Sequence, residues 1–148
     1  MGERLSLEMR RLLEERRLVR SRIRRGMILE ELKGARYDLE RSCKSLKDKD
    51  YKWATVQAYY SKFHATRALI YSRGFREKSH RALLTALREL FVRNGQLDRE
   101  YYDDLRNAMD LREEADYGMV FSEEGAIEVV EKAKKFLDKS ETILQDYQ

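Results

Sequence analysis

Side chains that could carry acid–base or metal chemistry are few in this chain. His64 and His80 are its two histidines, and Cys43 is its one cysteine. An imidazole can exchange protons near neutral pH, and several imidazoles together can hold a metal ion. The two histidines fall on different expected helices, so we do not expect them to form a metal site. A single cysteine also excludes an intramolecular disulfide and a thiolate metal cage.

Other patterns that would indicate a particular chemistry are missing from the sequence. There is no glycine-rich phosphate loop, no nucleophile elbow and no paired-cysteine metal spacing, and we therefore expect no cofactor. Arg112 and Asp116 are four residues apart, which on a helix favours an ion pair. Tyr117 follows, and a phenol is a poor base at neutral pH. From these residues alone, a purely structural role for the segment is as good an interpretation as a functional one.

The elements that must position these residues all have helical periodicity. Apolar residues recur at intervals of three and four, Pro is absent, and no window of four or more residues alternates as a strand. We expect helices over residues 4–24, 29–46 and 51–72, and three more that begin after Ser79, Asp98 and Ser122. The pattern predicts an all-α, up-and-down bundle of about five helices with an extra Arg-rich helix at the N-terminus.

The helix expected over residues 51–72 is predicted to be the central one. Alanines flank its apolar stripe on both sides, which would let neighbouring helices approach closely. The residues predicted to lie in the core are Trp53, Val56, Tyr60, Phe63 and Ile70. Tyr59 is predicted to lie at a flank or in a dimer contact.

Positive charge is concentrated in the first 25 residues. This segment holds nine Arg against four Glu, whereas the whole chain has a net charge of +4. We therefore divide the chain into a basic amphipathic helix, residues 1–25, and a helical bundle domain, residues 26–148. The arm has three open interpretations: packing on the body, forming a dimer contact, or binding RNA through its charge.

The sequence has no segment that is typical of membrane insertion or export. No stretch approaches the roughly 18 uncharged apolar residues of a membrane helix. The Arg-rich N-terminus contains no apolar signal-peptide core. We expect a cytoplasmic protein without a membrane partner.

Three segments of the chain carry a family resemblance. Residues 58–69 read Ala-Tyr-Tyr-Ser-Lys-Phe-His-Ala-Thr-Arg-Ala-Leu, residues 78–81 read Lys-Ser-His-Arg, and residues 111–118 read Leu-Arg-Glu-Glu-Ala-Asp-Tyr-Gly. In this order and spacing they resemble the signatures of the HEPN domain family. The resemblance covers about residues 28–146.

The resemblance implies a helical bundle that commonly dimerises. Many HEPN proteins are toxin ribonucleases neutralised by a small nucleotidyltransferase, and others bind nucleotides or act as inactive companions. Nuclease members carry an Arg, then four to six intervening residues, then a His, and the motif faces a second copy across the dimer cleft. They cleave RNA without a metal ion, with Arg stabilising charge on the phosphate and His moving protons.

Carried over to this chain, the motif begins at Arg112 and has Tyr117 where the nuclease members have His. The resemblance makes Arg112 and Tyr117 the candidate catalytic residues, with Asp116 and His80 as further contacts to RNA or nucleotide. It implies a homodimer and a small nucleotidyltransferase partner. Because Tyr117 replaces the imidazole, we predict a component of a two-component, toxin–antitoxin-like system that binds RNA or nucleotide with little catalysis. The alternative is a metal-independent ribonuclease toxin that uses Arg112 and Tyr117.

Overall fold

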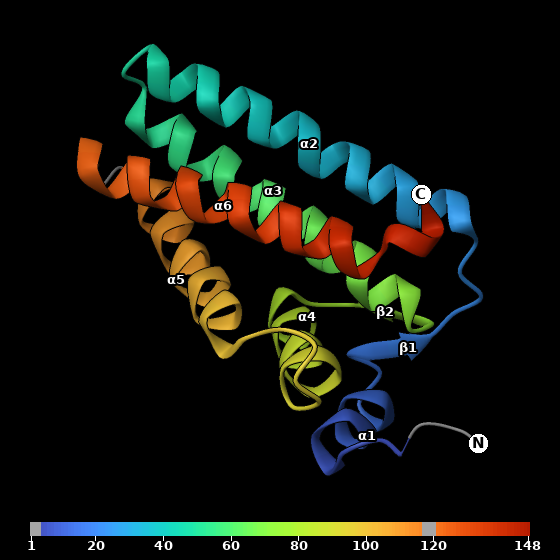
Figure 1. Ribbon diagram of the computed structural model, residues 1–148. Coiled ribbons are helices and arrows are strands. Elements are labelled where there is room, and N and C mark those ends of the chain that lie inside the picture. The colour runs from blue at the N-terminus through green and yellow to red at the C-terminus, as the bar shows by residue number, and fades with distance from the viewer. Residues whose placement is uncertain (1–3, 117–120) are drawn as a thin grey trace.

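Long helices packed along one another form the body of the molecule (Figure 1). This computed structural model describes residues 4–116 and 121–148, and the side chains of these residues except 113–116. The helices of the body are α2 (Arg25–Lys47), α3 (Tyr51–Ser72), α5 (Arg99–Asp116) and α6 (Glu123–Ile143). Helix α3 packs against the other three, which confirms its prediction as the central helix.

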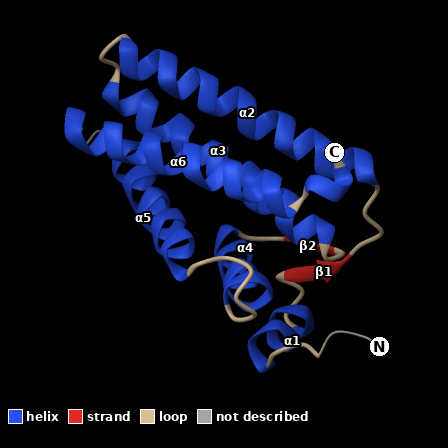
Figure 2. Cartoon of the chain, viewed as in Figure 1, coloured by secondary structure: helices blue, strands red, loops and turns tan. Residues whose placement is uncertain are grey.

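Shorter elements complete the fold. They are α1 (Leu7–Glu14), β1 (Leu18–Arg20), β2 (Phe75–Glu77), α4 (His80–Leu87), a π-helical turn η1 (Arg88–Val92) and a 3₁₀ turn η2 (Gln145–Tyr147). Strands β1 and β2 pair antiparallel, with Val19 opposite Arg76, and they lie with α1 and α4 beneath one end of the long helices (Figure 2). In the described part of the chain these two strands are the whole of the sheet, so the prediction of an all-α bundle is confirmed.

Side-chain caps set the starts of two helices that the sequence predicted. The Ser79 hydroxyl accepts a hydrogen bond from the backbone N–H of Ala82 at 3.1 Å, and α4 begins at the next residue. The Ser122 hydroxyl accepts one from the N–H of Gly125 at 3.0 Å at the start of α6. Each bond satisfies a backbone donor that the first helical turn leaves without a partner.

The N-terminal arm is not one continuous helix, and the expected extent of residues 4–24 is wrong. Helix α1 ends at Glu14, Arg16 follows with a left-handed φ of 57°, and the chain then enters β1. Leu18 in β1 is fully buried, and its partner strand lies far along the sequence. Periodicity within the arm cannot report that partner, and tertiary pairing therefore overrides the local helical pattern.

Apolar side chains of the N-terminal arm pack on the body of the protein. Met9 and Leu12 are buried, and α1 contacts both α4 and β1. This confirms the first of the three interpretations of the arm. The dimer-contact and RNA-binding interpretations stay predictions, as does the division of the chain after residue 25.

Helix α3 is buried on more than one face, and this changes part of the predicted core. Val56, Phe63 and Ile70 are buried as expected. Trp53, however, is 50% exposed in the first turn of the helix, so its prediction as a core residue is wrong. A helix with neighbours on several sides has no single apolar stripe, and 3–4 spacing alone cannot select its inward positions.

The tyrosine pair of α3 is also placed differently from the prediction. Tyr59 is only 1% exposed and belongs to the core, whereas Tyr60 is partly buried at the edge of the core. The rings of Tyr59 and Tyr60 meet edge to face, with centroids 5.1 Å apart. The prediction had assigned each tyrosine the position of the other. Tyr59, the inward one, is also the tyrosine that contacts the functional residues described below.

The core also contains a lysine. Lys62 is 1% exposed, and lysine is rarely buried to this degree. Burial lowers the pKa of its ammonium from 10.5 to about 8, although the negative charge of Asp104 opposes that shift. The Nζ atom donates a long hydrogen bond of 3.5 Å to the backbone carbonyl of Asp104.

The free energy of unfolding should therefore rise with pH above neutrality. Below pH 8 both states hold the Lys62 proton; above it the folded state releases a proton that the unfolded chain keeps up to about 10.5. Because the unfolded state then binds more protons, the free energy of unfolding should increase by about 2 kcal/mol between about pH 7 and pH 9.5. Urea denaturation of the wild type and of Lys62→Met measures this. If the free energy of unfolding of the two proteins changed with pH in the same way, the lowered pKa of Lys62 would be contradicted.

Candidate functional site

The arginine of the family-like motif lies against the central helix. Arg112, in the last turns of α5, is partly buried, and its guanidinium carbon lies 5.2 Å from the centre of the Tyr59 ring. An arginine cation over an aromatic face is stabilised by the electrons of the ring. The contact holds the guanidinium near α3, and its fork of N–H donors suits phosphate and carboxylate groups.

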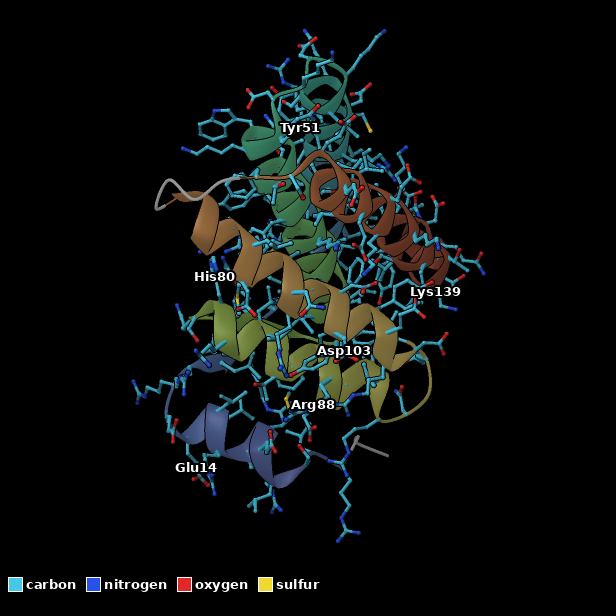
Figure 3. The ribbon with its side chains drawn as sticks, turned by 90° about the vertical axis from the view of Figure 1, so that its left-hand side faces the viewer. Glu14, Tyr51, His80, Arg88, Asp103 and Lys139 are labelled. Carbon is cyan, nitrogen blue, oxygen red and sulfur yellow. The ribbon has the colours of Figure 1, made fainter. Side chains whose placement is uncertain are left out.

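His80 contacts the same tyrosine. It is the first residue of α4, directly after the capping Ser79, and its side chain is exposed. The Tyr59 hydroxyl and His80 Nδ1 are 2.8 Å apart, which makes a hydrogen bond. The His80 ring also packs on Phe63, with centroids 4.6 Å apart. Figure 3 shows His80 at the end of α4 that lies beside α5.

Tyr59 thus joins two of the predicted site residues that are far apart in sequence. We call Arg112, Tyr59 and His80 the Arg–Tyr–His cluster. It combines a cation that can bind an anionic oxygen with an imidazole that can take up or release a proton. When the phenol donates to Nδ1, the imidazole proton lies on Nε2, the nitrogen of His80 that is farther from Tyr59.

The other two predicted site residues cannot be placed. Tyr117 lies outside the described residues, and Asp116 is described only as the last residue of helix α5. Their predicted roles, and the alternative ion pair between Arg112 and Asp116, therefore stay predictions.

Tyr59 is the member of the cluster that sequence reasoning missed. The prediction chose Tyr60 as the inward residue and left Tyr59 at a flank. A usable signal was present, because Tyr59, Phe63 and Arg67 follow at intervals of four and share one face of a helix. The structure confirms that face: Tyr59 and Phe63 pack together, and the Arg67 guanidinium lies 4.7 Å from the centre of the Phe63 ring.

His64, the second imidazole, belongs to a different network. Its Nδ1 lies 2.6 Å from a Glu31 carboxylate oxygen, and its Nε2 lies 3.4 Å from a carboxylate oxygen of Asp38. Both acids are on α2, so the contacts tie α2 to α3. Burial raises the pKa of the Asp38 carboxyl, and positive charge on His64 opposes this rise. His64 is therefore hydrogen bonded between two helices, and its side chain is partly exposed.

The described residues contain no cluster of three or more His, Cys, Asp or Glu side chains that could hold a metal ion. Among the same residues, no helix is both long and apolar enough to cross a membrane. The Arg–Tyr–His cluster itself offers a guanidinium, a phenol and an imidazole.

Comparison with known proteins identifies relatives of the chain. The model of the HEPN domain matches residues 29–143. A protein of Thermotoga maritima named "UPF0332 protein" is 29% identical over 103 residues, which cover 68% of this chain and 78% of the relative. An Archaeoglobus fulgidus protein of the same name is 34% identical over 92 residues, 61% of this chain and 73% of its own length. A Methanocaldococcus jannaschii protein named "Putative toxin MJ0142" is 28% identical over 96 residues, 64% of this chain and 65% of the relative.

Proposed function

The chain belongs to the HEPN domain family, and from this premise we propose that it is the HEPN component of a toxin–antitoxin-like pair. Its partner is a small nucleotidyltransferase, and it acts in the cytoplasm. Arg112 and its neighbours bind a phosphate group of RNA or of a nucleotide, and the chain has little catalytic activity of its own.

One observation carries this proposal: the Arg–Tyr–His cluster. Arg112 lies over Tyr59, and Tyr59 is hydrogen bonded to the exposed His80. An arginine held by an aromatic ring loses less side-chain freedom on binding a phosphate than a free one would. Two relatives with the name "Putative toxin" match 64% and 67% of this chain, and they support the same system.

Tyr117 is the reason for proposing weak catalysis. It occupies the position where the resemblance calls for histidine. At neutral pH a phenol keeps its proton, so it cannot accept one from a ribose hydroxyl as an imidazole does. The segment can still bind phosphate through Arg112.

A second function, ribonuclease activity, is favoured by the position of His80. The cluster supplies an imidazole from another helix, hydrogen bonded to the tyrosine over which Arg112 lies, although the motif itself lacks one. A histidine so placed could exchange protons during cleavage in place of the motif histidine. In that case His80, together with Arg112, carries the activity.

Removing the arginine tests the binding site directly. Arg112→Ala should weaken binding of a single-stranded RNA oligonucleotide or a nucleotide by about 10–100-fold, the worth of a hydrogen bond to a charged group. Folding should lose only about 1 kcal/mol, the order of a cation–π contact. Fluorescence anisotropy measures the first effect and urea denaturation the second.

Arg106→Ala is a matched control, because Arg106 is an exposed arginine on the same helix. It removes the same charge and should change binding much less. Equal losses for the two variants would mean that only net charge attracts the ligand, and the site at Arg112 would be refuted.

We also propose a homodimer whose interface includes the segment from Arg112 to Tyr117. The family resemblance places two copies of this motif face to face. Light scattering at tens of micromolar protein should give twice the mass of the 17.7 kDa chain. A monomeric mass at that concentration would contradict the dimer.

Co-expression with a small nucleotidyltransferase encoded beside it should yield a stable complex if the paired system is correct.

A further inference from the structure

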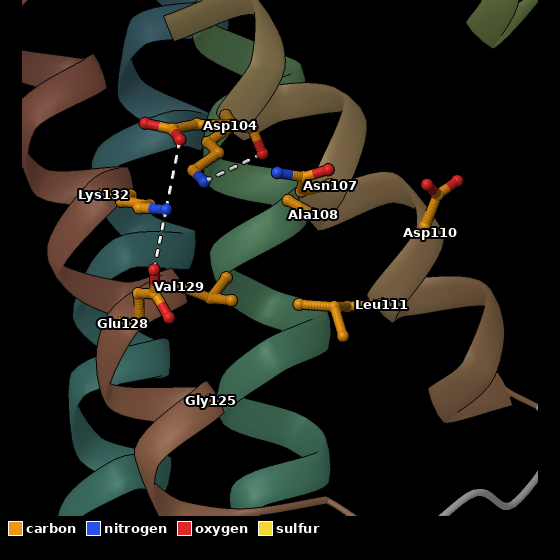
Figure 4. Close-up of a pocket in the computed structure, with 10 residues that line it drawn as sticks. Asp104, Asn107, Ala108, Asp110, Leu111, Gly125, Glu128, Val129 and Lys132 are labelled. Atoms are coloured by element: carbon orange, nitrogen blue, oxygen red, sulfur yellow. Dashed lines mark hydrogen bonds and ion pairs between the residues drawn. The ribbon is translucent and has the colours of Figure 1, made fainter. Parts of the chain in front are cut away.

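A second candidate site is a cavity that α5 helps to line. The cavity, of about 330 Å³, opens between α3, α5 and α6, and it shares no residue with the Arg–Tyr–His cluster. Leu111 lines it, whereas the next residue, Arg112, lies over Tyr59. Figure 4 shows the cavity with Asp104 and Lys132 toward one end and Gly125 toward the other.

Two lysines of the cavity differ in how their charges are balanced. Lys132 lies between two carboxylates, with its Nζ 3.2 Å from Asp104 and 2.8 Å from Glu128. Lys62 has no carboxylate within 4.0 Å among the described residues, and its Nζ makes only the long bond to the Asp104 carbonyl. An ammonium has three N–H donors, so this buried cation can donate hydrogen bonds to further acceptors.

The walls beside Lys62 are largely apolar. Ala108 and Leu111 of α5 face Val129 of α6 across the cavity (Figure 4). The remaining acids, Asp110 and Glu128, are exposed, where water screens their charges. Apolar walls beside one buried cation fit a small ligand whose apolar body carries one acceptor group at its end.

We propose that this cavity binds a small monocarboxylic acid, with the carboxylate hydrogen bonded to Lys62 and the apolar body against Ala108, Leu111 and Val129. The carboxylate supplies the acceptors that the buried ammonium lacks. A single negative charge suits the site better than a phosphate dianion, since three carboxylates already line the cavity. The proposal is independent of RNA binding at Arg112.

Benzoate and benzamide are suitable probes, because they match in size and differ in charge. NMR titration of the full chain near pH 7 should show benzoate binding with an affinity about ten-fold higher than that of benzamide. Lys62→Met keeps the volume and removes the cation, so it should weaken benzoate about ten-fold and leave benzamide unchanged. Lys134→Met, a change of an exposed lysine on the same helix as Lys132, should leave both affinities unchanged.

The wild type provides a measurement that needs no variant. Benzoate affinity should fall as the pH rises above about 8, where Lys62 loses its proton, and benzamide affinity should stay constant. Absence of benzoate binding at millimolar concentration would overturn the proposal. Equal affinities of wild type and Lys62→Met for benzoate would overturn it as well, as would benzoate affinity that does not change with pH.

Discussion

Tyr117→His is expected to raise RNA cleavage by about 10²–10⁴-fold over the unmodified protein. The substitution restores the imidazole that the family resemblance places near Arg112, and general acid–base catalysis is worth that range. A single-stranded RNA substrate incubated without metal ions measures the rate. The unmodified protein should cleave slowly or not detectably.

Three further variants separate the possible sources of cleavage. Tyr117→Phe removes the hydroxyl alone and should leave the low basal rate unchanged. Arg112→Ala added to Tyr117→His should abolish the gain, because the phosphate charge then has no guanidinium beside it. His80→Gln removes the second imidazole and reports whether any basal cleavage depends on the Arg–Tyr–His cluster.

Each outcome decides between the two proposed functions. Rapid cleavage by the unmodified protein that is lost in both Arg112→Ala and His80→Gln would replace the companion role with that of a ribonuclease. Tyr117→His without any gain in cleavage, together with unchanged RNA binding in Arg112→Ala, would leave the motif a structural role only.

Phe63→Ala is expected to lower the free energy of unfolding by about 3–5 kcal/mol. Phe63 is 7% exposed and packs against Tyr59 on its own helix and against His80 of α4. Truncation to Ala removes the burial of the ring and leaves a cavity between α3 and α4. Urea or thermal denaturation measures the loss.

Trp53→Ala on the same helix is the matched control. Its ring is 50% exposed, so its truncation should cost about 1 kcal/mol or less. A loss under about 1 kcal/mol for Phe63→Ala would contradict its place in the core. Because Phe63 supports the His80 ring, the variant should also loosen the Arg–Tyr–His cluster, which the RNA-binding assay would detect.

The sequence by itself determined the helical class of this protein, the main helices and the family. Spacing at three and four residues without Pro excludes long strands, and the polar caps Ser79 and Ser122 begin helices where they were expected. These signals are local: each depends on residues within a few turns of one another. The motif that contains Arg112 can likewise be recognised from the sequence alone, and so can Tyr117 in the place of its histidine.

Tertiary structure alone decided which side chains meet. The second half of the N-terminal arm became β1 because β2 offers it a hydrogen-bonding edge, and no pattern inside the arm reports that edge. Tyr59 is the buried tyrosine of the pair, and Tyr60 is not. Helices surround α3 on several sides, so periodicity alone could not identify which face holds the buried tyrosine. His80 reached Arg112 through Tyr59 for the same reason: three helices must pack before residues 59, 80 and 112 can touch.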